Sequence, residues 1–155
     1  MSADRTSGHA ALSGFRGDIA ILTQQNIAFR RVAYTANHCQ LVLMALQPGE
    51  DIGSEVHTVD QFFRIEAGSG EMVIEGLRSA IHSGSAIVVP AGARHNLVNT
   101  GHVPLKLYTL YAPPHHRDGV VHMTRADANR DDEHFDGLTT ELAPRAPAAV
   151  GNEPR

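Results

Sequence analysis

Four side chains with nitrogen or oxygen lone pairs stand beside apolar runs in the middle of the chain: Glu55, His57, Gln61 and His95. Glu55 and His57 are two residues apart, so on a strand both side chains point to the same face. Gln61 has the same parity as His57, and His95 follows a turn-forming segment, residues 90–94. If these segments converge inside a small barrel, the four side chains form a candidate metal site.

A simpler interpretation is that these polar groups hydrogen-bond to one another inside the barrel. The carboxylate of Glu55 argues against it, because a buried carboxylate without a cation must be paired or protonated. A second role for Glu55 is that of a general base beside a metal held by His57, Gln61 and His95. Of the two roles, we expect Glu55 to be a ligand.

Short apolar segments separated by turns must position these side chains. Turn signals recur about every eight to twelve residues, a spacing typical of an all-β sandwich or barrel. In the last segment Leu105, Leu107, Thr109 and Tyr111 are expected to face inward, while Lys106 faces water. The predicted strands cover residues 26–35, 40–47, 52–57, 62–66, 71–75, 79–82, 86–89, 96–99 and 105–111.

Two stretches, residues 53–68 and 84–99, resemble the two signature motifs of the cupin superfamily. The second motif matches throughout, with Gly84, Pro90, Gly92, His95 and Asn99 at the motif positions. The first motif matches in spacing, but its usual pattern is two histidines, a glutamate and a glycine. The corresponding residues here are Glu55, His57, Gln61 and Gly68.

The resemblance covers about residues 29–114 and implies a cupin double-stranded β-helix, the jelly-roll barrel of the RmlC-like proteins. In cupins the motif residues point into the barrel and hold one divalent metal. Carried over position by position, the ligands are Glu55, His57, Gln61 and His95. Two imidazoles, one carboxylate and one amide suit a divalent transition metal such as Zn, Fe, Mn or Ni.

This ligand set favours a small metalloenzyme that uses the metal as a Lewis acid on a small carbonyl or sugar-type substrate. Isomerases, cyclases and lyases of this kind fit it. An iron-dependent dioxygenase is an alternative, because one carboxylate with two histidines is also the ligand set of non-haem iron oxygenases. A further alternative is a non-catalytic module that binds a small molecule or a metal.

We predict one folded domain with flexible ends. A flexible N-terminal arm is expected over residues 1–16 and the cupin barrel over residues 17–114, with a short helix or turn near residues 18–26. Residues 115–136 are expected to form a loop and a short helix with Thr124 as its N-cap. Residues 137–155, rich in charge, Ala and Pro, are expected to be a disordered tail.

The composition limits which binding partners and which cellular compartment we expect for this protein. The formal charge of −4 offers no basic surface for nucleic acid or an anionic membrane, and no apolar run approaches the roughly 20 residues of a membrane span. The N-terminus lacks a signal-peptide pattern, and the lone Cys39, interpreted as a small buried apolar residue, is compatible with a reducing cytoplasm. We therefore expect a cytoplasmic protein that binds a small molecule. We also expect a homodimer, paired through the strand near residues 26–35.

Histidines and arginines outside the motifs have two interpretations each. His115, His116 and His122 follow the last strand and are interpreted as solvated residues of a surface loop, although near the barrel mouth they can assist chemistry or bind a second ion. Arg30, Arg31 and Arg64 can recognise an anionic ligand, but solvated strand faces explain them better. These side chains are therefore not assigned to the site.

Overall fold

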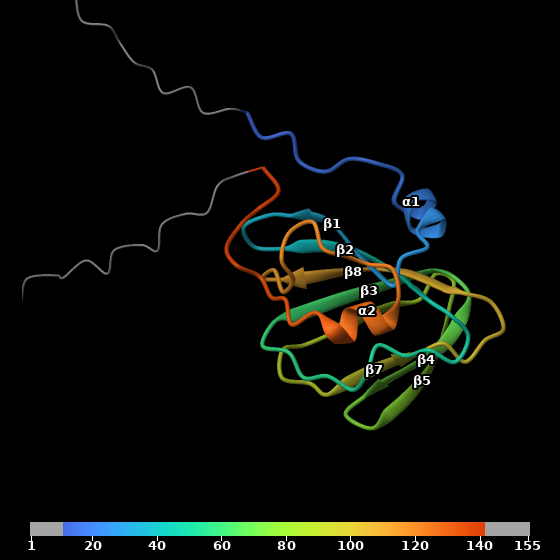
Figure 1. Cartoon of the computed structure of the whole chain (residues 1–155). Helices are drawn as coiled ribbons and strands as arrows, with labels where there is room; N and C mark the ends of the chain where they lie inside the picture. Colours follow the sequence, from blue (N-terminus) through green and yellow to red (C-terminus); the bar gives the residue numbers. More distant parts are fainter. Residues whose placement is uncertain (1–10, 142–155) are drawn as a thin grey trace, which may run out of the picture.

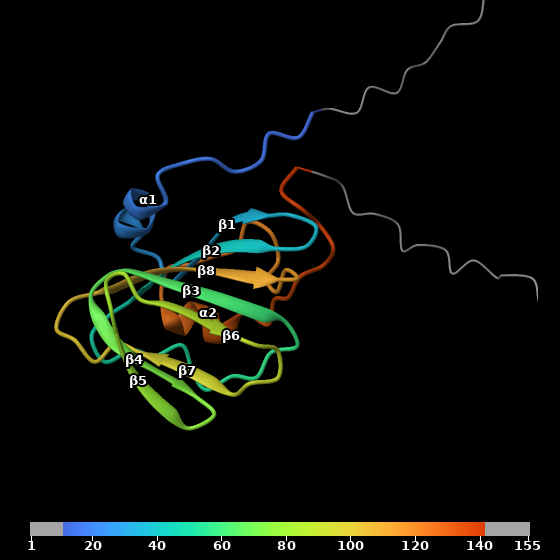
Figure 2. The same ribbon diagram turned by 180° about the vertical axis from the view of Figure 1, so that it is seen from behind.

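The computed structural model describes residues 11–141. Its elements are α1 (Ile19–Gln25), β1 (Arg30–Thr35), β2 (Gln40–Leu46), β3 (Asp60–Ala67), β4 (Ser69–Ile74), β5 (Leu77–His82), β6 (Ala86–Val89), β7 (His95–Val98), β8 (Leu105–Ala112), β9 (Val121–His122) and α2 (Arg125–Arg130). A six-stranded antiparallel sheet, in the order β6-β3-β8-β2-β1-β9, faces a three-stranded sheet in the order β5-β4-β7 (Figure 1, Figure 2). This arrangement confirms the predicted all-β jelly-roll fold.

The hydrophobic core lies between the two sheets. Leu107 of β8 is flanked in register by Met44 of β2 and Ile65 of β3, and all three side chains are buried. From the smaller sheet, Met72 of β4 and its register partner Leu97 of β7 are buried in the same cluster. The predicted alternation along β8 is confirmed, because its buried side chains are Leu105, Leu107, Thr109 and Tyr111.

The predicted strand over residues 52–57 is wrong. The segment forms only two isolated bridges, one from Asp51 to Val98 and one from Glu55 to His95. Gly53 lies between them with a φ of 92°, a left-handed conformation that interrupts an extended strand. The segment therefore runs as a loop beside β7, to which it is also joined by a bond of 3.0 Å from the Ile52 N–H to the Leu97 carbonyl oxygen.

Both helices are short and begin at a side-chain cap. The carboxylate of Asp18 accepts from the backbone N–H of Ile21 at the start of α1. Thr124 is the N-cap of α2, as predicted, and forms a capping box with Asp127. Within residues 11–141, no helix is long and apolar enough to cross a membrane.

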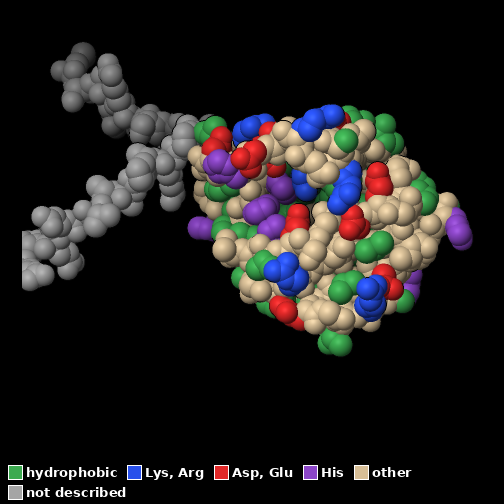
Figure 3. Space-filling view, turned by 60° about the horizontal axis from the view of Figure 1, so that its bottom comes forward, with side chains coloured by type: hydrophobic (Ala, Val, Ile, Leu, Met, Phe, Trp, Pro, Cys, Tyr) green, Lys and Arg blue, Asp and Glu red, His purple; other side chains and the backbone are tan. Residues whose placement is uncertain are grey.

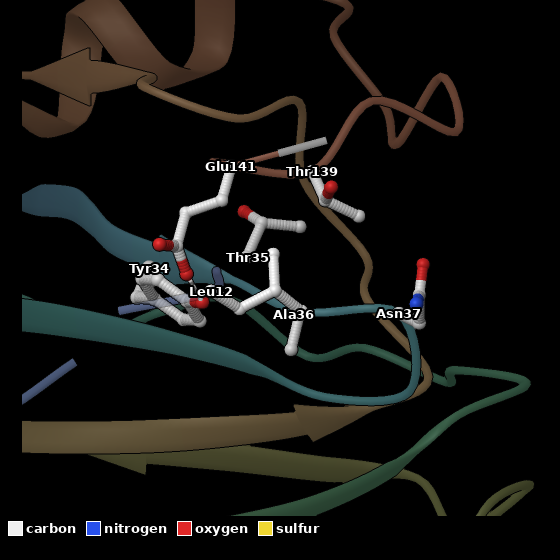
Figure 4. Close-up of a pocket in the computed structure, with 7 residues that line it drawn as sticks. All are labelled: Leu12, Tyr34, Thr35, Ala36, Asn37, Thr139 and Glu141. Atoms are coloured by element: carbon white, nitrogen blue, oxygen red, sulfur yellow. Dashed lines mark hydrogen bonds between the residues drawn. The ribbon is translucent and has the colours of Figure 1, made fainter. Parts of the chain in front are cut away.

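Residues near the two ends of the described chain meet beside β1. Oxygens of the Glu141 carboxylate accept from the backbone N–H groups of Ser13 and Gly14 and from the hydroxyl of Tyr34. Figure 4 shows the Glu141 carboxylate beside the Tyr34 hydroxyl, and both residues line a pocket of about 80 Å³. The predicted N-terminal arm and C-terminal tail otherwise fall on residues 1–10 and 142–155, which lie outside the described residues.

Cys39 is exposed, so its interpretation as a buried apolar residue is wrong. It lies in the turn between β1 and β2, where the backbone N–H of Ala36 donates to the Cys39 carbonyl oxygen at 2.9 Å. A hairpin turn projects from the end of the sheet, so the short side chain does not reach the core.

The outer edge of β1 is already paired over part of its length. It pairs with β9, and the backbone N–H groups of Phe29 and Val32 donate to Met123 and Val120. Part of the edge expected to pair through residues 26–35 is therefore already covered within the chain. The homodimer itself stays a prediction, and β6 is the strand at the opposite edge of this sheet.

Asn99 joins the end of β2 to the loop between β7 and β8. Its side chain is buried, and its Nδ2 donates to the carbonyl oxygens of Leu46 and Val103, both at 2.9 Å. Its Oδ1 accepts from the backbone N–H of Gly101 at 2.9 Å. One side chain therefore provides hydrogen-bond partners for three backbone groups that strand pairing does not supply with one.

We expect Asn99→Ala to lower the free energy of unfolding by about 2–4 kcal/mol, because it leaves these buried backbone groups without partners. Urea denaturation followed by circular dichroism measures the change. The matched control is Asn37→Ala at an exposed turn position, which should stay within about 0.5 kcal/mol of the wild type. Equal losses in the two variants would contradict this role for Asn99.

Candidate metal centre

Glu55, His57 and His95 come together at one end of the barrel. Their ligand atoms all lie within 4.8 Å of one another. Two backbone hydrogen bonds of 2.9 Å join residue 55 to residue 95, one in each direction. A further bond of 2.8 Å, from the Gly92 N–H to the His57 carbonyl oxygen, joins the two loops. The backbone thus places the three side chains together independently of any ligand.

His95 presents a bare lone pair to this cluster. It begins β7, and its ring is buried. Its Nδ1 lies 3.0 Å from the carbonyl oxygen of Ala93, which can only accept, so Nδ1 carries the proton. Its Nε2 is buried and has no hydrogen-bond partner within the described chain. A buried acceptor without a hydrogen-bond partner costs folding free energy. Because the proton is fixed on Nδ1, the lone pair of Nε2 is available to bind a metal ion.

Glu55 and His57 form a hydrogen-bonded pair beside His95. His57 Nε2 lies 2.8 Å from Glu55 Oε2. Burial acts to raise the pKa of Glu55, but the hydrogen bond from His57 and the positive charge of Arg30 outweigh it. The pKa of Glu55 therefore lies below its ordinary value. The carboxylate is ionised at neutral pH, which is the form that binds a cation.

Gln61, the fourth predicted ligand, lies on β3 with its side chain buried. Its Nε2 donates to Thr109 Oγ1 at 3.0 Å, so the amide oxygen Oε1 faces away from that contact. Oε1 is buried and, like His95 Nε2, has no partner within residues 11–141. The amide can therefore supply an oxygen, while the histidine and carboxylate ligand atoms that lie close to one another are those of Glu55, His57 and His95.

These residues fit a divalent transition metal. The donor set contains two imidazoles, a carboxylate and an amide oxygen, which suits Zn, Fe, Mn or Ni. Two of the donors, His95 Nε2 and Gln61 Oε1, are buried acceptors without partners in the described part of the chain. A site that already satisfied its own polar groups would not leave such atoms, so the observation favours a metal over the internally hydrogen-bonded alternative.

A wall of histidines and one tyrosine continues from this centre, which makes the solvated interpretation of these histidines wrong. The ring of His115 lies 4.3 Å from that of His57, centroid to centroid, and stacks on Tyr111 at 5.2 Å. His116 is 6% exposed and His122 is 4% exposed. Figure 3 shows histidine side chains gathered with an acidic side chain in a hollow of the surface.

Acidic residues further along the chain hold these histidines in place. His116 Nδ1 lies 2.5 Å from Glu133 Oε1, and His122 Nε2 lies 2.9 Å from Asp131 Oδ2. The buried Gln40 of β2 accepts from the backbone N–H of His116 and donates to its carbonyl oxygen. In the sequence, these two carboxylates stand close together on the segment after α2. The sequence does not show which residues they contact, because their histidine partners lie 9 and 17 residues earlier in the chain.

The double-stranded β-helix and the histidine–glutamate centre inside it define a cupin. Residues 42–111 match the family model described as the cupin domain, and the chain belongs to this family. The crystal structure of BH2720 from Bacillus halodurans is 44% identical, with a TM-score of 0.74 over 76% of this chain and 94% of that chain.

Two curated relatives are also similar. YrkC of Bacillus subtilis, an uncharacterized protein, is 50% identical over 113 residues, which cover 68% of this chain and 61% of the relative. The uncharacterized protein L612 of Acanthamoeba polyphaga mimivirus is 41% identical over 108 residues, covering 66% of this chain and 68% of the relative. The chain thus spans less than two thirds of the length of YrkC.

We expect the wild-type protein to bind about one equivalent of Zn, and His95→Ala to bind it at least about 100-fold more weakly, because Nε2 is lost. Mass spectrometry of untagged protein and competition with a chelator measure stoichiometry and affinity. The control is His102→Ala at an exposed loop position, which should keep the wild-type affinity. A protein that takes up none of Zn, Fe, Mn or Ni would contradict the site.

Glu133 should make the stability of the protein depend on pH. Its side chain is only 3% exposed. Burial acts to raise its pKa, but hydrogen bonds from His116 and from the backbone N–H of Arg117 lower it to about 2. Because the folded pKa is below the unfolded value of 4.5, the stabilisation is complete above pH 4.5 and is lost as the pH falls toward 2.

We expect Glu133→Gln to lower the free energy of unfolding at pH 7 by about 1–3 kcal/mol. The difference in unfolding free energy between the variant and the wild type should shrink as the pH falls below the pKa of an ordinary carboxyl group. Urea denaturation across this range measures it. Asp132→Asn, at the exposed neighbouring position, serves as the control and should follow the wild-type curve. A difference that stays constant with pH would show that the Glu133 charge is not involved.

Proposed function

We propose that this protein is a small metal-dependent enzyme that holds one divalent metal through Glu55, His57 and His95, with Gln61 as a fourth oxygen donor. The observation that carries the proposal is the buried, unpartnered Nε2 of His95, which faces a carboxylate and a second imidazole. The family membership supports it, because cupins commonly bind a divalent metal at these motif positions.

The proposed substrate is a small carbonyl or sugar-type compound, and the reaction an isomerase-, cyclase- or lyase-type proton transfer. A divalent metal bound here supplies a Lewis acid that polarises a carbonyl oxygen. In the alternative in which His57, Gln61 and His95 alone hold the metal, Glu55 is the residue that can move a proton, because its carboxylate is ionised and its side chain is one-third exposed. His57 Nε2, hydrogen-bonded to Glu55 Oε2, holds this carboxylate in place.

The residues around the centre shape the space for the substrate. Tyr111 and His115 stack on each other and pack against the ring of His57, so they form one wall. Burial raises the pKa of Tyr111, so its hydroxyl stays protonated at neutral pH. It can therefore donate a hydrogen bond to His116 Nε2, which lies 3.3 Å away, and keep this wall ordered.

A dioxygenase that uses iron is the second candidate. The observation that favours it is the composition of the close cluster, two histidines and one carboxylate, which is the ligand set of non-haem iron oxygenases. A non-catalytic module that binds a metal or a small molecule is the third candidate, and it takes the lead if the metal-loaded protein has no activity in the assays below.

The test is hydrogen exchange at the carbon next to a carbonyl. Protein loaded with Zn, Mn, Ni or Fe is incubated in D₂O with a panel of 2-oxo acids and ketoses, and deuterium uptake is followed by proton NMR. We expect exchange that depends on metal and falls at least about 100-fold in Glu55→Gln. The matched control is Glu71→Gln on β4, whose carboxylate pairs with the exposed Arg78, and it should exchange at the wild-type rate.

The same samples separate the two roles of Glu55 and the two enzyme classes. A Glu55→Gln variant that keeps its metal but loses exchange identifies Glu55 as the base, whereas loss of the metal identifies it as a ligand. Oxygen uptake by the iron-loaded protein, with no exchange under any metal, favours the dioxygenase. No exchange and no oxygen uptake with any metal rejects both enzyme proposals.

A further inference from the structure

Arg30 begins β1 beside the candidate metal centre. It is two residues from Val32, so both side chains lie on the same face of the strand, and Val32 belongs to the core. The Arg30 side chain is half-buried. Within residues 11–141 it forms no ion pair with a carboxylate, and its buried Nε has no hydrogen-bond partner. A half-buried guanidinium with so few partners has donors available for an external anion.

His122 fixes the position of this guanidinium. Arg30 Nη1 lies 3.3 Å from His122 Nδ1, and because a guanidinium can only donate, Nδ1 is the acceptor. The proton of the ring then lies on Nε2, which donates to Asp131 Oδ2 at 2.9 Å. Arg30 and His122 are also backbone register partners between β1 and β9. Arg30 is therefore held in place by a neutral imidazole, and its charge is not neutralised there.

The positive charge of Arg30 acts on two carboxylates, one in the metal centre and one beside the histidine wall. For both Glu55 and Glu133, burial raises the pKa and hydrogen bonds from histidines lower it, and the positive charge of Arg30 adds to the lowering. Arg30 therefore lies close enough to both carboxylates to act on them electrostatically. Figure 3 shows basic side chains at the border of the hollow that holds the histidines.

We infer that Arg30 determines substrate specificity by binding a carboxylate group of the substrate, while the rest of the same molecule reaches the metal centre. The inference rests on the proposed function. A guanidinium matches a carboxylate with two parallel hydrogen bonds. The nearby charges of Glu55 and Glu133 repel a doubly charged phosphate more than a singly charged carboxylate. The substrate class is therefore a small monocarboxylic acid with a second oxygen function.

The test compares acids with their neutral amides. Calorimetry on zinc-loaded protein measures the binding of acetate, pyruvate and benzoate, of acetamide, pyruvamide and benzamide, and of inorganic phosphate. We expect at least one acid to bind about tenfold or more tightly than its amide and than phosphate. Arg30→Gln should abolish this preference, and Arg30→Lys should retain part of it. The control is Arg31→Gln, because Arg31 Nε instead bonds to Asn26 Oδ1.

Metal content and the thermal melting curve are recorded for every variant. Loss of the acid preference in Arg30→Gln, with wild-type zinc content and melting, supports the inference. An acid preference that is unchanged in Arg30→Gln, or no binding of any acid to the wild type, overturns it. If the protein takes up no metal, the same comparison is made on the metal-free protein. An Arg30-dependent preference there would support the carboxylate site while the metalloenzyme proposal fails.

Discussion

Reciprocal backbone hydrogen bonds between residues 55 and 95 are the constraint on which the candidate centre depends. They join a loop before β3 to the first residue of β7, and the bond from Gly92 to the His57 carbonyl oxygen adds a third connection. Gly92, with a φ of 86°, takes the left-handed conformation that the turn before β7 requires. The side chains of Glu55, His57 and His95 then converge from a rigid backbone, so a metal ion would meet ligands that are already in place.

The histidine wall depends on residues far away in the chain. His116 is held from one side by Gln40 on β2 and from the other by Glu133 after α2. The segment after β8 is therefore connected to the sheet and to itself by buried hydrogen bonds, which are stronger in low dielectric surroundings than at the surface. This explains how a stretch with only a two-residue strand and a short helix keeps ordered side chains beside the centre.

Strand alternation and the second motif made the fold and the place of His95 predictable, because both depend on local spacing. The burial of Leu105, Leu107, Thr109 and Tyr111 follows directly from their parity. The burial of His116 and the contact of Arg30 with His122 were not predictable, because the partners Glu133 and His122 lie 17 and 92 residues away. Gly53 gave no sequence signal that distinguished a turn within a strand from a loop with two bridges.

The span that matches the family model, residues 42–111, contains all four predicted ligands. Arg30, His115 and His116 lie outside it, although the ring of His115 packs against that of His57. The candidate ligands and the side chains beside them therefore belong to different segments of the chain. A search with the family model alone would find the four ligand positions and would not register the residues that flank them.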